Sequence, residues 1–91
     1  MILCDTGAIF AADRRDADHH ACVDLSPSDV ARVAELVAQY DDLPLGTTDA
    51  SVIALAERLG VDEIATLDQR HFRVVRPRHV DALTLLPEPT R

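Results

Sequence analysis

The sequence contains no lysine, because all nine of its basic residues are arginine. Mechanisms that need a lysine nucleophile or a phosphate-binding lysine are therefore excluded, and with them the P-loop and response-regulator classes. Basic residues of any kind are also outnumbered by 16 acidic ones, which gives a formal net charge of −7. Binding of nucleic acid by bulk electrostatics requires an excess of positive charge. If RNA binds to this chain, metal ions must help.

Cysteines and long apolar runs are scarce too. Cys4 in a predicted strand and Cys22 near a predicted helix end are too few for the disulfide framework of a secreted protein, and we expect both to be buried thiols. The first apolar run, Met1–Cys4, stops at Asp5, and no later run reaches the length of a signal sequence or a membrane span. We therefore expect a cytoplasmic protein that does not associate with membranes.

The composition is that of a small folded domain. Apolar residues make up 47% of the 91 residues and charged residues 27%, a balance typical of globular proteins. A chain of this size has a thin core, which a partner surface would help to cover. No internal repeat or linker divides it, so we expect a single domain over residues 1–91.

Short apolar strands alternate with amphipathic helices along the chain. The expected strands cover residues 1–4, 63–67 and 82–86, and the expected helices cover residues 8–13, 16–23, 27–40 and 49–59. Strands that alternate with helices indicate right-handed βαβ crossovers. The sequence thus predicts an α/β fold with a parallel sheet flanked by helices.

The two longer helices have recognisable ends and apolar stripes. Ser26 is the predicted N-cap of the first, with Pro27 at its first position and Asp29 three residues beyond the cap. Thr48 is the predicted N-cap of the second, and Gly60 is placed to end it in a left-handed conformation. The stripes expected to face the core are Val30, Val33, Ala34 and Val37 in the first helix, and Val52, Leu55, Ala56 and Leu59 in the second.

Three aspartates are predicted to meet at one edge of the sheet. Asp5 and Asp68 each follow an apolar strand, and ligands of open parallel sheets bind beyond the carboxyl ends of the strands. Asp49 lies in the first turn of a helix and can project toward the same edge. Close carboxylates repel one another unless a cation bridges them, and oxygen ligands favour Mg²⁺ or Mn²⁺ over zinc. Taken singly, each aspartate could instead cap a helix, complement a helix dipole or start a turn.

Motifs along the whole chain resemble a known family. They are Ile2–Thr6, Asp49–Ser51 with Ala54–Ala56, and Ala65–Asp68 with His71-Phe72. Together they resemble the PIN domains of VapC-type toxins. The resemblance implies a three-layer PIN fold and a Mg²⁺- or Mn²⁺-dependent endoribonuclease that forms the toxin component of a type II toxin–antitoxin system. It implies an RNA substrate, a cognate antitoxin and a homodimer as partners.

The same resemblance assigns roles to individual residues. Asp5, Asp49 and Asp68 would be the catalytic residues and metal ligands, and the ions would activate water and stabilise charge on the phosphate. Thr6 and Thr66 would be supporting hydroxyls beside the carboxylates; ordinary turn and strand packing is their alternative role.

The chain departs from the family pattern between Val23 and Leu25. The family usually has another strand and two helices there, and one of those helices supplies a fourth acid, a glutamate. Either the gene carries an internal deletion or residues are missing from this sequence at that point. Glu35 and Glu57 lie on helices that the family uses for other purposes, so neither takes the vacant role. A second hypothesis follows, in which the chain is a catalytically impaired PIN remnant that binds an antitoxin or a sister toxin.

Other candidate sites are weaker. A run from Arg70 to His79 contains no acid and either follows an RNA backbone or is a solvated basic edge. The cluster from Asp16 to Cys22 lacks the second ligand pair of a zinc site, which favours a surface helix. A phosphohydrolase of the haloacid dehalogenase type needs an acid two residues after Asp5, where this chain has Gly7.

Overall fold

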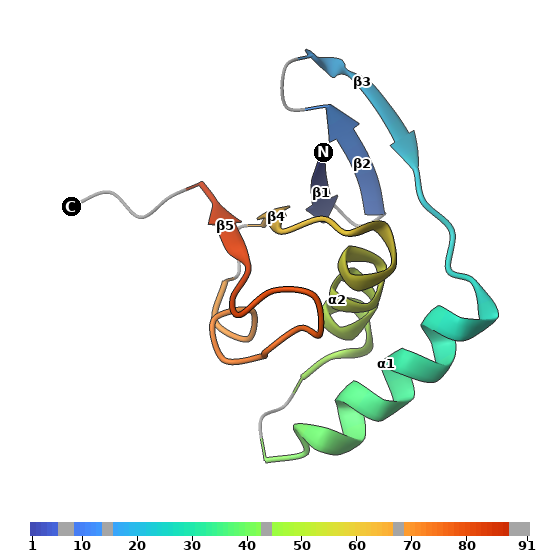
Figure 1. Ribbon diagram of the computed structural model, residues 1–91, viewed down its shortest axis with the longest axis vertical. Helices are drawn as coiled ribbons and strands as arrows, with labels where there is room; N and C mark the ends of the chain where they lie inside the picture. The colour runs from blue at the N-terminus through green and yellow to red at the C-terminus, as the bar shows by residue number, and fades with distance from the viewer. Residues whose placement is uncertain (6–8, 14–15, 43–44, 67–68, 88–91) are drawn as a thin grey trace.

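A computed structural model describes residues 1–5, 9–13, 16–42, 45–66 and 69–87 (Figure 1). Its elements, in chain order, are β1 (Ile2–Asp5), β2 (Ile9–Asp13), β3 (Asp16–Cys22), α1 (Pro27–Gln39), α2 (Thr47–Leu59), β4 (Glu63–Ala65) and β5 (Thr84–Leu86). No helix among these residues is long and apolar enough to cross a membrane.

The strands form one mixed sheet in the order β3-β2-β1-β4-β5. Its centre is parallel: β1 pairs with β4, in a register that sets Leu3 beside Ile64, and β4 pairs with β5. The last two expected strands are shorter than predicted, three residues each. The α/β class and the parallel pairing of the strands that precede Asp5 and Asp68 are confirmed.

The prediction of helices over residues 8–13 and 16–23 was wrong. Within these segments Ile9–Asp13 forms β2 and Asp16–Cys22 forms β3. Strand β2 pairs with both β1 and β3, and both pairings are antiparallel. The sequence signal was weak because each segment is short and its alanines are compatible with a helix. Pairing with the edge of β1 satisfies the backbone groups of β2, and Ile9 and Ala11, two residues apart, pack against the core as alternate residues of a strand do.

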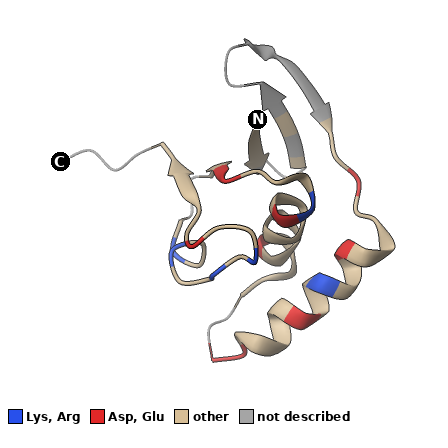
Figure 2. Cartoon of the chain, in the orientation of Figure 1, with Lys and Arg blue, Asp and Glu red and all other residues tan. Residues whose placement is uncertain are grey.

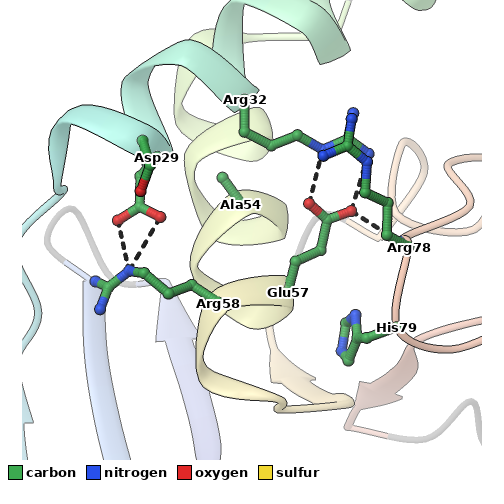
Figure 3. Close-up of a pocket in the computed structure, with 8 residues that line it drawn as sticks. Asp29, Arg32, Ala54, Glu57, Arg58, Arg78 and His79 are labelled. Carbon is green, nitrogen blue, oxygen red and sulfur yellow. Dashed lines mark hydrogen bonds and ion pairs between the residues drawn. The ribbon is translucent and has the colours of Figure 1, made fainter.

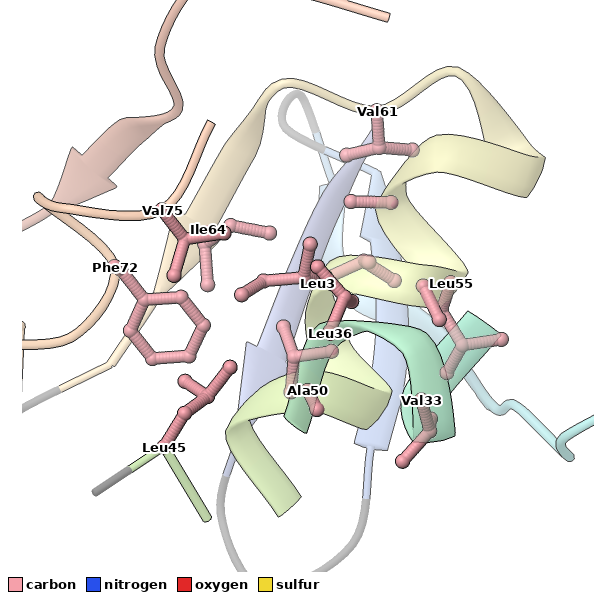
Figure 4. Close-up of a cluster of buried hydrophobic side chains, with 14 residues drawn as sticks. Leu3, Val33, Leu36, Leu45, Ala50, Leu55, Val61, Ile64, Phe72 and Val75 are labelled. Carbon is pink, nitrogen blue, oxygen red and sulfur yellow. The ribbon is translucent and has the colours of Figure 1, made fainter. Parts of the chain in front are cut away.

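The helices lie in successive layers beyond the sheet. Helix α2 packs on the sheet and α1 packs chiefly against α2, so the layers follow one another as sheet, α2 and α1 (Figure 1). Residues 50–56 of α2 are all buried, because this helix has neighbours on both sides. Leu3 and Ile64 from the sheet meet Leu36 from α1 and Phe72 from the segment after β4 in one core (Figure 4).

The ends of the helices follow their predicted signals with one exception. Ser26 forms a capping box with Asp29: the Asp29 backbone N–H donates to Ser26 Oγ at 3.2 Å, and the Ser26 backbone N–H donates to Asp29 Oδ2 at 2.8 Å. Gly60 ends α2 with φ of 67°, the left-handed conformation expected of it. The N-cap of α2 is Gly46 rather than Thr48, so the helix begins at Thr47, two residues earlier than a Thr48 cap would allow.

The predicted apolar stripe of α1 was largely wrong. Val33 is buried, but Val30 is 57% and Val37 38% exposed, and Ala34 is exposed as well. The contact with α2 is instead made by the arc that includes Asp29, Val33 and Leu36. The stripe of α2 is buried except for Leu59, which is 36% exposed.

Both thiols are free, and neither is fully buried. Cys4 is half-buried and Cys22, at the end of β3, is exposed, so the expectation of two buried thiols was wrong. Cys22 is exposed because β3 lies at the edge of the sheet, where only β2 adjoins it.

Candidate metal centre

The carboxyl ends of β1 and β4 meet at one edge of the sheet. Because the strands are parallel and Cys4 is paired with Ala65, the next residues, Asp5 on β1 and Thr66 after β4, come side by side at this edge. Thr66 is 8% exposed, and its backbone N–H donates to the Leu86 carbonyl at 2.9 Å. The side chain of Asp5, and Thr6 and Asp68 entirely, lie outside what the structure describes.

Helix α2 brings Asp49 to the same end of the sheet. Its C-terminus leads through Val61 into β4, beside the start of β1, so the helix runs back along the strands and its N-terminus lies at their carboxyl ends (Figure 4). Asp49 is in the first turn, where the positive end of the helix dipole favours a carboxylate. Its side chain is 25% exposed and therefore within reach of a hydrated cation.

Asp49 has a defined partner in His71. His71 Nδ1 lies 2.9 Å from Asp49 Oδ2, and the His71 side chain is 18% exposed. Since a carboxylate accepts, the Nδ1–H donates and fixes one oxygen of Asp49. Phe72, the next residue, is 2% exposed in the core and anchors the segment that carries His71. This pair was not anticipated from the sequence, where His71 appeared only in a family motif and in the basic run after Asp68.

The described side chains do not by themselves form a complete metal site. Among them there is no group of three or more His, Cys, Asp or Glu residues that could hold an ion. Asp49 is the one predicted ligand whose side chain is described, and it suits Mg²⁺ or Mn²⁺: it is a hard oxygen donor, partly exposed, at the edge where β1 ends in Asp5.

A comparison with known families decides the identity of this fold. The sequence profile of the family described as "PIN domain" matches residues 2–77. The chain belongs to the PIN-domain family. The matched region includes β1, both helices and β4, and all three aspartates that were predicted to meet at the sheet edge.

One curated relative of this PIN protein is "Ribonuclease VapC26" from Mycobacterium tuberculosis (strain ATCC 25618 / H37Rv). The two are 35% identical over 60 residues, which is 66% of this chain and 44% of the relative. The chain thus spans less than half the length of that ribonuclease. In the structure only four residues, 23–26, separate β3 from α1, and none of them belongs to a helix or strand.

A second polar feature lies between α1, α2 and residues 78–79, around a hollow of roughly 320 Å³ (Figure 3). Glu57 accepts hydrogen bonds from Arg32 Nε at 2.7 Å and Nη2 at 2.9 Å, and from the Arg78 backbone N–H at 2.8 Å. Arg78 Nη2 also donates to Glu35 at 2.7 Å. Burial would raise the pKa of the Glu57 carboxyl, but the hydrogen bonds from Arg32 and Arg78 outweigh it, so its pKa lies below the usual 4.5. The hydrogen bond to Glu57 also raises the pKa of the Arg32 guanidinium.

Asp29 forms the other ion pair beside this hollow (Figure 3). Its carboxylate is 3% exposed and accepts from Arg58 Nε at 2.8 Å and 3.0 Å. Burial alone would raise the pKa of Asp29, but hydrogen bonds from Ser26 and Arg58 lower it below its usual 3.8. Glu57 is paired with Arg32 and Glu35 with Arg78, so neither glutamate adds to the candidate metal centre at Asp49. We interpret the hollow as a structural joint, since its acids and arginines neutralise one another.

The basic run after Asp68 does not form one continuous free face. Arg78 is paired with Glu35, His71 with Asp49, and His79 Nε2 lies 2.6 Å from the Val61 carbonyl. Arg73 and Arg76 are exposed. The run is therefore partly a structural edge, and any contact with RNA would fall on its exposed arginines. In the cluster from Asp16 to Cys22, the side chains before Cys22 lie outside what the structure describes.

Proposed function

We propose that this PIN-domain chain is a Mg²⁺- or Mn²⁺-dependent endoribonuclease, cytoplasmic, and the toxin component of a type II toxin–antitoxin system. Its substrate would be RNA and its partners a cognate antitoxin and a second copy of the chain, within a single domain over residues 1–91. Asp5, Asp49 and Asp68 are the proposed metal ligands and catalytic residues.

The observation that supports the proposal is that the start of α2, which carries Asp49, lies at the same end of the sheet as the carboxyl end of β1. Asp49 lies in the first turn of α2, Asp5 ends β1, and Thr66 directly follows β4, the parallel neighbour of β1. These three positions lie at one edge of the sheet. Neighbouring strands lie roughly 4.8 Å apart, so side chains projecting from this edge are within reach of one ion. Similarity to a ribonuclease supports RNA as the substrate.

The chain's own residues would bind the metal ion and hold its ligands in position. Carboxylates at the edge supply charged oxygen ligands, and His71 limits the rotation of the Asp49 carboxylate through its 2.9 Å bond. When bound, Mg²⁺ or Mn²⁺ supplies the positive charge that activates water and stabilises the phosphate as the phosphodiester is cleaved. It also offsets the repulsion between RNA and a chain with a net charge of −7.

The test is cleavage of a pooled RNA substrate by the purified chain with Mn²⁺, with and without EDTA. We expect cleavage that EDTA abolishes and that Asp49→Asn reduces by at least about a hundredfold, as loss of a ligand carboxylate should. Asp62→Asn is the matched control, because Asp62 is an exposed acid at the opposite end of the sheet, just before β4. Cleavage that survives EDTA, or equal loss in both variants, would contradict the proposed centre.

A second candidate function is a PIN remnant that binds an antitoxin or a sister toxin without cleaving RNA. The observation that favours it is the four-residue connection between β3 and α1, where the family pattern carries a strand, two helices and a glutamate. Calorimetry with Mn²⁺ and the RNA cleavage assay together separate the two functions. A chain that binds Mn²⁺ through Asp49 but does not cleave RNA would be the remnant; a chain that does both would be the nuclease.

A further inference from the structure

The arginines of this chain differ in what holds them. Arg32, Arg58 and Arg78 each pair with an aspartate or a glutamate. Arg73 is exposed, and no carboxylate among the described residues pairs with it. Its Nη2–H donates instead to the neutral side-chain amide of Gln69, whose Oε1 lies 3.0 Å away. Arg73 is therefore held in place by a bond that does not neutralise its charge.

Gln69 is itself fixed at the carboxyl edge of the sheet. Its Nε2 donates to the Pro87 carbonyl at 2.9 Å and to the Thr66 carbonyl at 3.4 Å. Thr66 follows β4 and Pro87 follows β5, so these bonds join Gln69 to the ends of two parallel strands. The Gln69 carbonyl also accepts the Arg73 backbone N–H at 3.3 Å. Backbone and side chain together thus hold Arg73 beside this edge.

The same turn of the chain contacts the candidate metal centre. His71, two residues before Arg73, has its Nδ1 2.9 Å from Asp49 Oδ2. Phe72, between the two, is 2% exposed in the core and anchors the turn. Figure 2 shows arginines in blue on this segment, which joins β4 to β5. One anchored turn therefore presents a histidine to a proposed metal ligand and, two residues further on, an arginine without a carboxylate partner among the described residues.

The amide at position 69 combines two roles that a carboxylate could not. It donates to the carbonyls at the sheet edge, and it accepts from Arg73 without forming an ion pair. A glutamate at this position would pair with Arg73 at i,i+4 and offset its charge. An oriented arginine that keeps its charge suits an anion from outside the chain, because its planar fork matches the oxygens of a phosphate.

We infer that Arg73 binds a phosphate of the RNA near the cleavage site, and that Gln69 is the positioning residue that orients its guanidinium. A chain with a net charge of −7 repels RNA, so contact with the phosphates depends on local cations. The inference rests on the proposed function, because it takes RNA to be the substrate. It adds a binding residue that is separate from the proposed metal ligands.

The test is the affinity for a labelled single-stranded RNA pool, measured by fluorescence anisotropy. Ca²⁺, which also takes oxygen ligands, replaces Mn²⁺, and gel electrophoresis verifies that the RNA stays intact. Arg73→Gln should lower the affinity roughly tenfold, the effect of losing hydrogen bonds between charged groups. The plot of log affinity against log salt, at constant Ca²⁺, should become less steep by about 0.7, the value for one phosphate contact with a single strand.

Two further variants separate orientation from net charge. Gln69→Glu retains Arg73 but offsets its charge, and it should weaken binding about as much as Arg73→Gln does. Arg78→Gln is the matched control: Arg78 is already paired, and its neighbour His79 lies against the Val61 carbonyl, at the opposite end of β4. Its affinity should stay within about twofold of the wild type. Thermal unfolding should show that the variants are folded. If Gln69→Glu is not, Arg73→Lys replaces it and should recover only part of the affinity, because the planar fork is lost.

Binding and cleavage are measured separately, so the two proposals can fail separately. Cleavage of RNA with equal binding by the wild type and Arg73→Gln would overturn this inference and leave the nuclease in place. Binding that depends on Arg73, without cleavage, would support the inference and contradict the nuclease. Equal losses in Arg73→Gln and Arg78→Gln would overturn the inference, since net charge alone would then explain them. So would a wild type that does not bind RNA. Unchanged binding by folded Gln69→Glu would overturn the positioning role of Gln69.

Discussion

A carboxylate that binds a cation must present its oxygens in a fixed direction, because every freely rotating bond spreads the ligand over many positions. Asp49 gains this restraint from His71, whose Nδ1 lies 2.9 Å from Asp49 Oδ2. His71 in turn is held by its neighbour Phe72, which is 2% exposed in the core. The pair thus connects a partly exposed functional residue to the packed interior.

Replacing His71 by alanine should weaken Mn²⁺ binding by about 10–100-fold, the usual effect of losing a residue that orients a metal ligand. His71→Asn should restore much of the affinity, because its amide N–H replaces the Nδ1–H donor. Titration calorimetry of both variants measures the effect without any need for catalysis. Wild-type affinity in His71→Ala would show that Asp49 needs no such restraint or is not a ligand.

At the scale of the element, the path of the chain from α2 into β4 depends on the conformation that ends the helix. Gly60 has φ of 67°, and space is open around the position where a Cβ would lie, so a side chain there meets backbone strain but no clash. This turn sends the chain through Val61, which is 4% exposed, into β4. The position of β4, and of the residues after it, follows from this one conformation.

Gly60→Ala should lower the free energy of unfolding by about 1–2 kcal/mol, the cost of placing an L-residue in the left-handed region. Gly60→Asn should cost less, because asparagine tolerates this conformation. Urea unfolding followed by circular dichroism measures both. Equal stability of the wild type and the alanine variant would mean that the turn adjusts without strain.

Helix α1 is fixed to α2 by Asp29, which completes the capping box and pairs with Arg58. Asp29→Ala should cost about 1.5–3 kcal/mol of stability, the range for hydrogen bonds to charged groups. A larger penalty is not expected, because Arg58 is 38% exposed and stays hydrated without its partner. Arg58→Met, measured by urea unfolding beside it, should cost less, since Asp29 would keep its bonds with Ser26.

On the scale of the whole molecule, two carboxylates with lowered pKa values connect the helices and the segment after Arg76. Glu57 joins α2 to Arg32 of α1 and to Arg78, and Asp29 joins α1 to α2. A carboxylate whose pKa is lower in the folded state stabilises the fold above its unfolded pKa, and this stabilisation is lost as the pH falls toward the folded value.

The free energy of unfolding should therefore fall as the pH drops below the usual pKa values of these groups, 4.5 for Glu57 and 3.8 for Asp29. Asp29→Asn/Glu57→Gln should be less stable at neutral pH but should lose less stability on acidification. Urea unfolding across this pH range gives the two slopes. Parallel slopes for the variant and the wild type would show that other carboxylates dominate the acid response.

Sequence alone determined the features that depend on neighbouring residues. The capping box at Ser26, the left-handed Gly60 and the apolar strands before Asp5 and Asp68 are local patterns, each with a local physical cause. The combination of motifs also led to the PIN family, which the match over residues 2–77 confirms. The shared metal centre remains a prediction, supported at Asp49.

Tertiary structure decided what depends on partners distant in the chain. Segments 8–13 and 16–23 contain β-strands because β2 pairs with the edge of β1 and β3 pairs with β2, and this pairing of backbone groups is not encoded by any local pattern. The bond between Asp49 and His71 exists because α2 runs back along the parallel strands. Periodicity marked the apolar residues of α1, but only its contact with α2 determined that Val33 is buried while Val30 is exposed. The sequence of a helix shows how much apolar surface the helix has, and the neighbouring elements determine which part of that surface is buried.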